Sequence, residues 1–152
     1  MEKTPDTNVL QPVGRILSRL GKSYLHLMNA KLNYIDIKRE YYALILIELG
    51  NNNITQNELA RQLETDKVSI VRIIDYLAAT GYVDRVRSST DRRKYCLTLT
   101  DKAKKALPEI KKVLNEVRAT AFESLSESQV ALFYLTLNTI KTNLIKANTS
   151  GI

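Results

Sequence analysis

The sequence is poor in the residues from which most catalytic and metal sites are built. It contains one cysteine, Cys96, and one histidine, His26, so an intrachain disulfide is excluded. Its five glycines form no phosphate-binding loop, and its acidic residues show no metal-ligand spacing. We therefore expect a protein that is not an enzyme and that uses no metal or cofactor.

Long apolar runs are also missing. No stretch approaches the roughly 18 apolar residues that a membrane-spanning helix needs, and the first residues lack the apolar run of a signal peptide. A single cysteine suits a reducing compartment. With 152 residues the chain is long enough for one domain with a buried core. We expect a cytoplasmic protein with no membrane segment.

Basic residues exceed acidic residues, 23 against 16, giving a formal net charge of +7. Such a balance suggests an anionic partner, of which nucleic acid is the commonest. The excess is spread along the chain except at residues 84–94, where five basic residues accompany two acidic ones. This placement is more informative than the total charge.

Hydrophobic periodicity predicts a mainly α fold with one small β-hairpin. Apolar residues recur at helical spacing over 12–32, and residues 37–49 are apolar nearly all round, as in a buried helix. Gly50 is expected to close the second helix in the left-handed conformation. Thr100 should cap a helix over 101–123. Ser126 and Gln129 should form a capping box for a last helix over 127–147. That helix is expected to bury Val130, Phe133, Leu137, Ile140 and Leu144.

The middle of the chain contains two helices joined by a very short turn. Thr55 and Glu58 form a capping box that starts the first helix, which ends near Leu63. Asp66 is the expected N-cap of the second helix, over 67–80, and Gly81 ends it. Helices joined so tightly cross steeply, which is the geometry of a helix-turn-helix.

Residues 82–87 and 94–99 are strand-like and flank a polar turn at 88–91, so they should pair as a hairpin. A hairpin after a helix-turn-helix makes a winged helix, and this wing carries Arg87, Asp91, Arg92, Arg93 and Lys94. A hairpin tip fits a DNA minor groove, where arginine gains from the negative potential. Asp91 is expected to hold the Arg93 guanidinium extended. The alternative is that Asp91 only forms the turn and the arginines are a solvated surface.

A helical wheel divides residues 67–80 into two sides. The side expected to face the core carries Ile70, Ile73, Ile74, Leu77 and Ala78. The opposite side, which suits a DNA major groove, carries Lys67, Val68, Ser69, Val71 and Arg72. The two valines either contact thymine methyl groups or pack against a neighbouring helix or the wing. Asp75 is expected to pair with Arg72 and not to contact DNA.

Residues 55–102 resemble the MarR family of bacterial transcription regulators. The resemblance rests on TQNELA at 55–60, DKVSIVR at 66–72, Leu77, Gly81, DRR at 91–93 and LTLT at 97–100. It implies one MarR-like domain, with a winged helix-turn-helix lobe at 53–100 and dimerisation helices at 12–34 and 101–147. It further implies a homodimer on a near-palindromic double-stranded DNA operator, with recognition helices in major grooves and wings in minor grooves.

Many members of this family are repressors that a small aromatic or phenolic effector releases from DNA. The candidates to line an effector pocket are Tyr24, His26, Tyr41 and Tyr42. Alternatively, the last two tyrosines belong to the core and the histidine is satisfied or exposed. The resemblance thus implies a sequence-specific DNA-binding transcription regulator, a repressor that a small-molecule effector releases from DNA. The alternative is a winged-helix module for protein–protein interaction.

Overall fold

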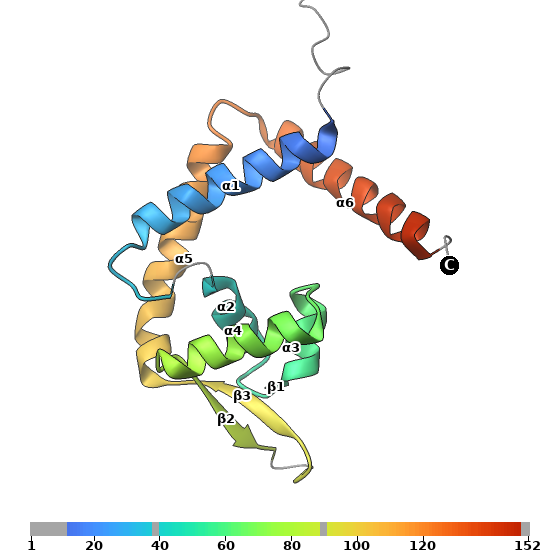
Figure 1. Cartoon of the computed structure of the whole chain (residues 1–152). Helices are drawn as coiled ribbons and strands as arrows, with labels where there is room; N and C mark the ends of the chain where they lie inside the picture. Colours follow the sequence, from blue (N-terminus) through green and yellow to red (C-terminus); the bar gives the residue numbers. More distant parts are fainter. Residues whose placement is uncertain (1–11, 38–39, 89–90, 150–152) are drawn as a thin grey trace, which may run out of the picture. The chain divides into compact units, whose positions relative to one another are not determined.

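The computed structural model describes residues 12–37, 40–88 and 91–149 (Figure 1). The elements are α1 (Val13–Lys31), α2 (Tyr41–Leu49), β1 (Ile54–Thr55), α3 (Gln56–Gln62), α4 (Lys67–Ala79), β2 (Val83–Arg87), β3 (Tyr95–Leu99), α5 (Asp101–Ala121) and α6 (Glu127–Thr149). The predicted mainly helical fold with a small sheet is confirmed. The chain divides into two compact units, residues 1–117 and 118–152. Within the described residues, no helix is both long enough and apolar enough to cross a membrane.

The sheet has three antiparallel strands in the order β1-β3-β2. The predicted hairpin pairs Val83 with Leu99 at its base and Arg87 with Tyr95 at its far end, and it extends away from α3 and α4 of the same unit (Figure 1). Residues 89 and 90 of the predicted turn lie outside the described residues. Strand β1 was not predicted, because two residues are too short to show an alternating pattern.

The core of the first unit is built from its helices and its sheet together. Fully buried side chains include Met28, Leu44, Ile47, Leu59, Ile70, Ile74, Leu77, Tyr82, Leu97, Leu107 and Ile110. The predicted core side of α4 is confirmed, with Ile73 and Ala78 half-buried at its edges. Leu97 and Leu99 on β3 are buried too, and they fix the hairpin to this core.

Local capping determines where α3 and α4 begin. The Thr55 hydroxyl accepts a hydrogen bond from the Glu58 N–H (3.3 Å), and the Glu58 carboxylate accepts one from the Thr55 N–H (2.7 Å), so the capping box is confirmed. The Asp66 carboxylate accepts hydrogen bonds from the N–H groups of Val68 and Ser69, both at 2.8 Å. Gly81, at φ +77°, ends α4 as predicted.

The end of α2 differs from the prediction. Gly50 has φ −79°, and the left-handed residues are Asn51 (φ 53°) and Asn52 (φ 55°). Asparagine adopts this conformation more readily than most residues because its short side chain bonds locally. The Asn52 side-chain oxygen also accepts a hydrogen bond from the Leu99 N–H (2.9 Å), which ties the turn to β3. The helix itself begins at Tyr41 and not at 37; residues 38–39 lie outside the described residues.

The second unit contains the end of α5 and the whole of α6. The predicted capping box is confirmed, since the Ser126 N–H donates to Gln129 (2.8 Å) and the Gln129 N–H donates to Ser126 (3.2 Å). The prediction that α6 buries five apolar residues is wrong for the single chain, because none of its residues is buried. Phe133 is 40% exposed and Leu144 is 60% exposed. The periodicity is that of a buried helix, but α6 has no buried residue in the described structure.

Candidate nucleic-acid interface

The outer side of α4 presents side chains that are free to meet a partner. Lys67, Val68, Val71 and Arg72 are exposed, and Ser69 is half-buried. Val68 is 62% exposed and Val71 is 39% exposed, so neither valine packs away against a neighbouring helix or the wing. Apolar groups exposed beside a lysine and an arginine can meet thymine methyl groups while the cations meet phosphates or base edges.

The carboxylate of Asp66, which caps the N-terminus of α4, has a lowered pKa. Hydrogen bonds from the Ser69 hydroxyl and from the Ser69 and Val68 N–H groups hold the pKa of Asp66 below its ordinary value of 3.8. A carboxylate whose folded pKa is lowered stabilises the protein above its unfolded pKa, and this contribution disappears as the pH falls through the folded pKa.

We therefore expect acid to destabilise the parent protein partly through Asp66. The variant Asp66→Asn keeps a capping side chain that does not titrate. Its thermal midpoint should fall less than that of the parent between about pH 5 and about pH 3, which circular dichroism can follow. Equal falls in the two proteins would show that this cap does not contribute to acid sensitivity.

Asp75 does not pair with Arg72, contrary to the prediction. Its carboxylate accepts a hydrogen bond from the Arg85 guanidinium at 2.5 Å, an ion pair between α4 and β2. Strand β2 follows α4 after a short turn and brings this guanidinium to the helix, a tertiary contact that outweighs a weak i,i+3 pair. Within the described part of the chain, Arg72 has no hydrogen bond or ion pair. It is therefore available to a partner.

The wing is closed by backbone bonds and by Asp91. The Ser88 N–H donates to the Lys94 carbonyl, and the Lys94 N–H donates to the Asp91 carbonyl, both at 2.9 Å. The Asp91 carboxylate accepts a hydrogen bond from the Arg93 backbone N–H (3.0 Å). The prediction that it holds the Arg93 guanidinium is therefore wrong. The carboxylate prefers the nearer N–H because that bond closes a local turn.

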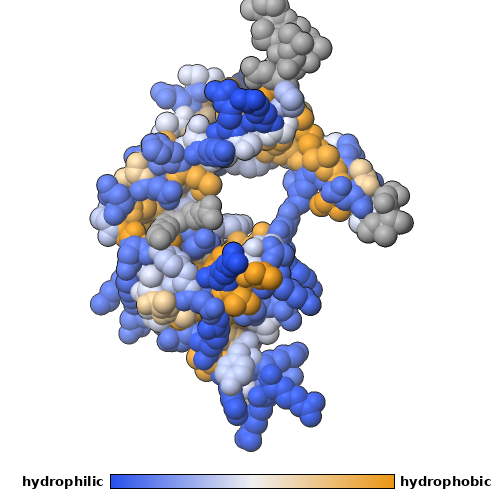
Figure 2. All heavy atoms as spheres, in the orientation of Figure 1, coloured by the Kyte–Doolittle hydropathy of each residue, from blue (hydrophilic) through white to orange (hydrophobic). Residues whose placement is uncertain are grey.

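The basic side chains of the wing differ in how firmly they are held. The Arg87 Nε donates to the Tyr95 hydroxyl (3.3 Å), and the guanidinium lies 5.9 Å from the centre of the Tyr95 ring. Arg92 and Arg93 are exposed, and Lys94 lies 3.9 Å from Asp91. The far end of the hairpin is hydrophilic (Figure 2).

A pocket of about 460 Å³ lies between the wing and α3. This pocket was not predicted from the sequence. Its lining is Thr55, Gln56, Asn57, Glu58, Arg61, Arg93, Lys94 and Tyr95. The lining includes three cationic side chains and one carboxylate, and hydrogen bonds from Thr55 hold the pKa of Glu58 below its ordinary value. Such a pocket suits the phosphate backbone of DNA beside the wing. No local motif marks it, because its two walls are more than 30 residues apart in the sequence.

The structure brings together only two of the four candidate effector residues. Tyr41 is buried, and Tyr24 packs against the same core. Burial and the neighbouring Tyr24 raise the pKa of Tyr41. His26 and Tyr42 are exposed, and His26 lies two residues from Tyr24, on the opposite side of α1. Among the described residues, no group of histidine, cysteine and acidic side chains could hold a metal ion.

Comparison with known proteins finds one family, that of the MarR regulators, by sequence and by structure. Residues 35–94 match the model of the MarR family. A MarR transcriptional regulator from Methanosarcina mazei is 29% identical, with a TM-score of 0.75 over 89% of this chain and 97% of that chain. A MarR protein from Peptoclostridium difficile is 26% identical, with a TM-score of 0.77 over 95% and 92%. A mutant MarR from E. coli complexed with operator DNA shares the fold at 22% identity, with a TM-score of 0.78 over 90% and 99%.

Proposed function

We propose that the chain is a member of the MarR family of transcription regulators, whose model matches residues 35–94, and that it is a repressor that binds a double-stranded DNA operator as a homodimer. Helix α4 enters the major groove through Lys67, Val68, Ser69, Val71 and Arg72. The wing enters the adjacent minor groove through its arginines. The protein acts in the cytoplasm.

The observation that carries this proposal is the exposed side of α4 next to an exposed basic hairpin. Arg72, Arg92 and Arg93 all reach solvent, and Asp75, the acidic side chain nearest to them on α4, is neutralised by Arg85. Arginine forms bidentate hydrogen bonds with guanine and is attracted into narrow minor grooves. The related regulator complexed with operator DNA supports the same use of this fold.

Helix α6 supports the proposed homodimer. Its exposed large apolar residues are Leu132, Phe133, Tyr134, Leu135, Leu144 and Ile145. An apolar surface of this extent on a globular protein usually marks an interface with another chain. We assign it to a second copy of this chain, because a near-palindromic operator is matched by a protein with two-fold symmetry.

The proposed effector is a small aromatic or phenolic molecule near Tyr24 and Tyr41. These residues line the core between α1 and α2, where a ring could stack on them. Release from DNA requires that the effector bind the DNA-free conformation more tightly than the DNA-bound conformation.

Fluorescence anisotropy tests the proposed function. The duplex is taken from upstream of the protein's own gene and is titrated in the presence of excess non-specific duplex, at low and at near-physiological salt. We expect tight binding that survives the competitor, a stoichiometry of two chains per duplex, and an affinity that falls steeply with salt. Binding that is abolished by competitor and depends little on salt would instead favour a winged-helix module for protein interaction.

A further inference from the structure

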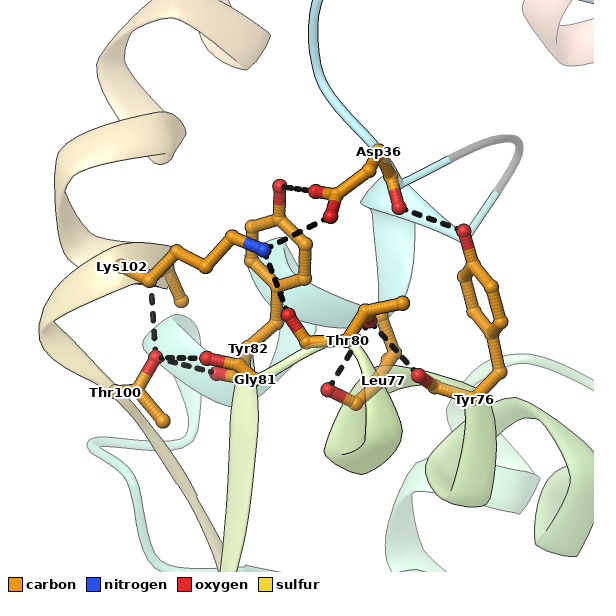
Figure 3. Close-up of polar contacts among 9 residues, drawn as sticks. Asp36, Tyr76, Leu77, Thr80, Gly81, Tyr82, Thr100 and Lys102 are labelled. Carbon is orange, nitrogen blue, oxygen red and sulfur yellow. Dashed lines mark hydrogen bonds and ion pairs between the residues drawn. The ribbon is translucent and has the colours of Figure 1, made fainter.

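A cluster of polar side chains at the C-terminal end of α4 centres on Asp36, which lies in the segment between α1 and α2 (Figure 3). Its carboxylate accepts a hydrogen bond from the Tyr82 hydroxyl at 2.5 Å and pairs with the Lys102 ammonium at 3.0 Å. Lys102 belongs to the first turn of α5, and its ammonium also lies 4.3 Å from the centre of the Tyr82 ring. One carboxylate therefore joins the segment after α1 to the start of α5.

The same cluster is hydrogen-bonded to the C-terminal end of α4. The Tyr76 hydroxyl donates to the Asp36 backbone carbonyl at 2.6 Å, and the Lys102 ammonium donates to the Thr80 carbonyl at 2.7 Å. In Figure 3 the two tyrosine hydroxyls approach Asp36 from opposite sides. The last turn of α4 is thus tied both to the α1–α2 segment and to α5.

The polar anchors of α4 lie at its N-terminus and in its C-terminal half. Asp66 caps the N-terminus, Asp75 pairs with Arg85 on β2, and the adjacent Tyr76 donates to Asp36. A helix of 13 residues is about 20 Å long, so a small shift at one end tilts the side chains near the other. Recognition side chains need to be held within about 0.5 Å of their productive geometry.

We propose that Asp36 is a positioning residue for DNA recognition, although it lies on the segment between α1 and α2 and not on the DNA-reading surface. It holds the far end of α4 so that Val68, Val71 and Arg72 meet the base edges in register. The inference rests on the proposed function. It adds that the specificity of the operator contact depends on a junction outside the winged helix-turn-helix lobe.

The sign of one mutational effect tests the inference. Asp36→Ala removes the carboxylate with its bonds to Tyr82 and Lys102, and keeps the backbone carbonyl that accepts from Tyr76. The loss of a negative charge alone predicts tighter DNA binding. Loss of positioning predicts the opposite, and we expect the affinity for the operator to fall at least about fivefold while the affinity for non-specific duplex is unchanged or slightly higher. Exposed ion pairs add little to stability, so the variant should remain folded at 25 °C, which circular dichroism can verify.

Glu48→Ala is the matched control. Glu48 on α2 lies outside the expected dimerisation helices and pairs with Lys111 of α5 in an exposed ion pair that includes no residue of α4. Removing it makes the same change in charge, and the ratio of specific to non-specific affinity should stay at the parent value. Equal ratios for Asp36→Ala and Glu48→Ala would overturn the inference.

Tyr82→Phe provides a second variant without a change in charge. It keeps the buried ring and removes only the hydroxyl that donates to Asp36, so we expect the same direction of change in the affinity ratio. An unchanged ratio in this variant would contradict the role of Asp36. If the parent itself shows no preference for the operator, the proposed function fails, and that result is distinct from a failure seen only in the variants.

Discussion

Replacing Arg93 by alanine is expected to weaken operator binding by roughly 1–3 kcal/mol. The structure leaves this side chain exposed at the wing and fixes its backbone, because the Arg93 N–H donates to the Asp91 carboxylate. A guanidinium presented in this way can enter a minor groove, where the potential is most negative. Anisotropy with the operator duplex, at fixed salt, measures the loss.

Arg15→Ala is the control for this prediction. Arg15 is exposed in the first turn of α1, and its removal changes the net charge by the same amount. Interactions between exposed charges are screened beyond about 10 Å in salt, so this variant should bind DNA almost as the parent does. Equal losses for the two variants would show that only total charge matters and that the wing does not contact DNA. Dimerisation should be unchanged in Arg93→Ala, and Arg15→Ala is compared with it at concentrations at which both variants are shown to be dimers.

Replacing Leu97 by alanine is expected to destabilise the protein by about 2–5 kcal/mol. Leu97 is 2% exposed, and it lies on the central strand, between Ile54 of β1 and Arg85 of β2. Its removal would leave a cavity where all three strands meet the core. A loss of this size is a large fraction of the total stability of an ordinary domain, and urea denaturation can quantify it.

Val86→Ala is the matched control on the same hairpin. Val86 is 48% exposed and pairs with Cys96, so its truncation removes little buried surface. Substitutions at such positions usually change stability by about 0.5 kcal/mol or less. If Leu97→Ala were as mild as Val86→Ala, the wing would be anchored by its backbone pairing and not by Leu97.

The sequence predicts features that are decided within a few residues. The capping box of Thr55 and Glu58, the Asp66 cap and the left-handed Gly81 all depend on neighbours along the chain. The hairpin was equally predictable, because its alternating pattern and its turn residues lie within one short segment. These elements already indicate a winged helix.

The errors concern partners that are distant in the sequence or absent from the chain. Asp75 had a plausible local partner in Arg72, but the fold supplies Arg85 from the next strand. The Asp36 cluster joins residues as far apart as 36 and 102, so no local pattern marks it. The apolar pattern of α6 predicts burial, yet no residue of α6 is buried in the described structure, because such a pattern does not say what would cover the helix.

The two sides of α4 have a consequence for how such a protein changes over evolutionary time. Ile70, Ile74 and Leu77 hold the fold, whereas Val68 and Arg72 on the other side contribute almost nothing to it. Surface substitutions of the second kind cost little stability. Duplicated copies of this gene could therefore diverge toward different operators without passing through unfolded intermediates, and a designer could retarget the protein by changing the same exposed positions.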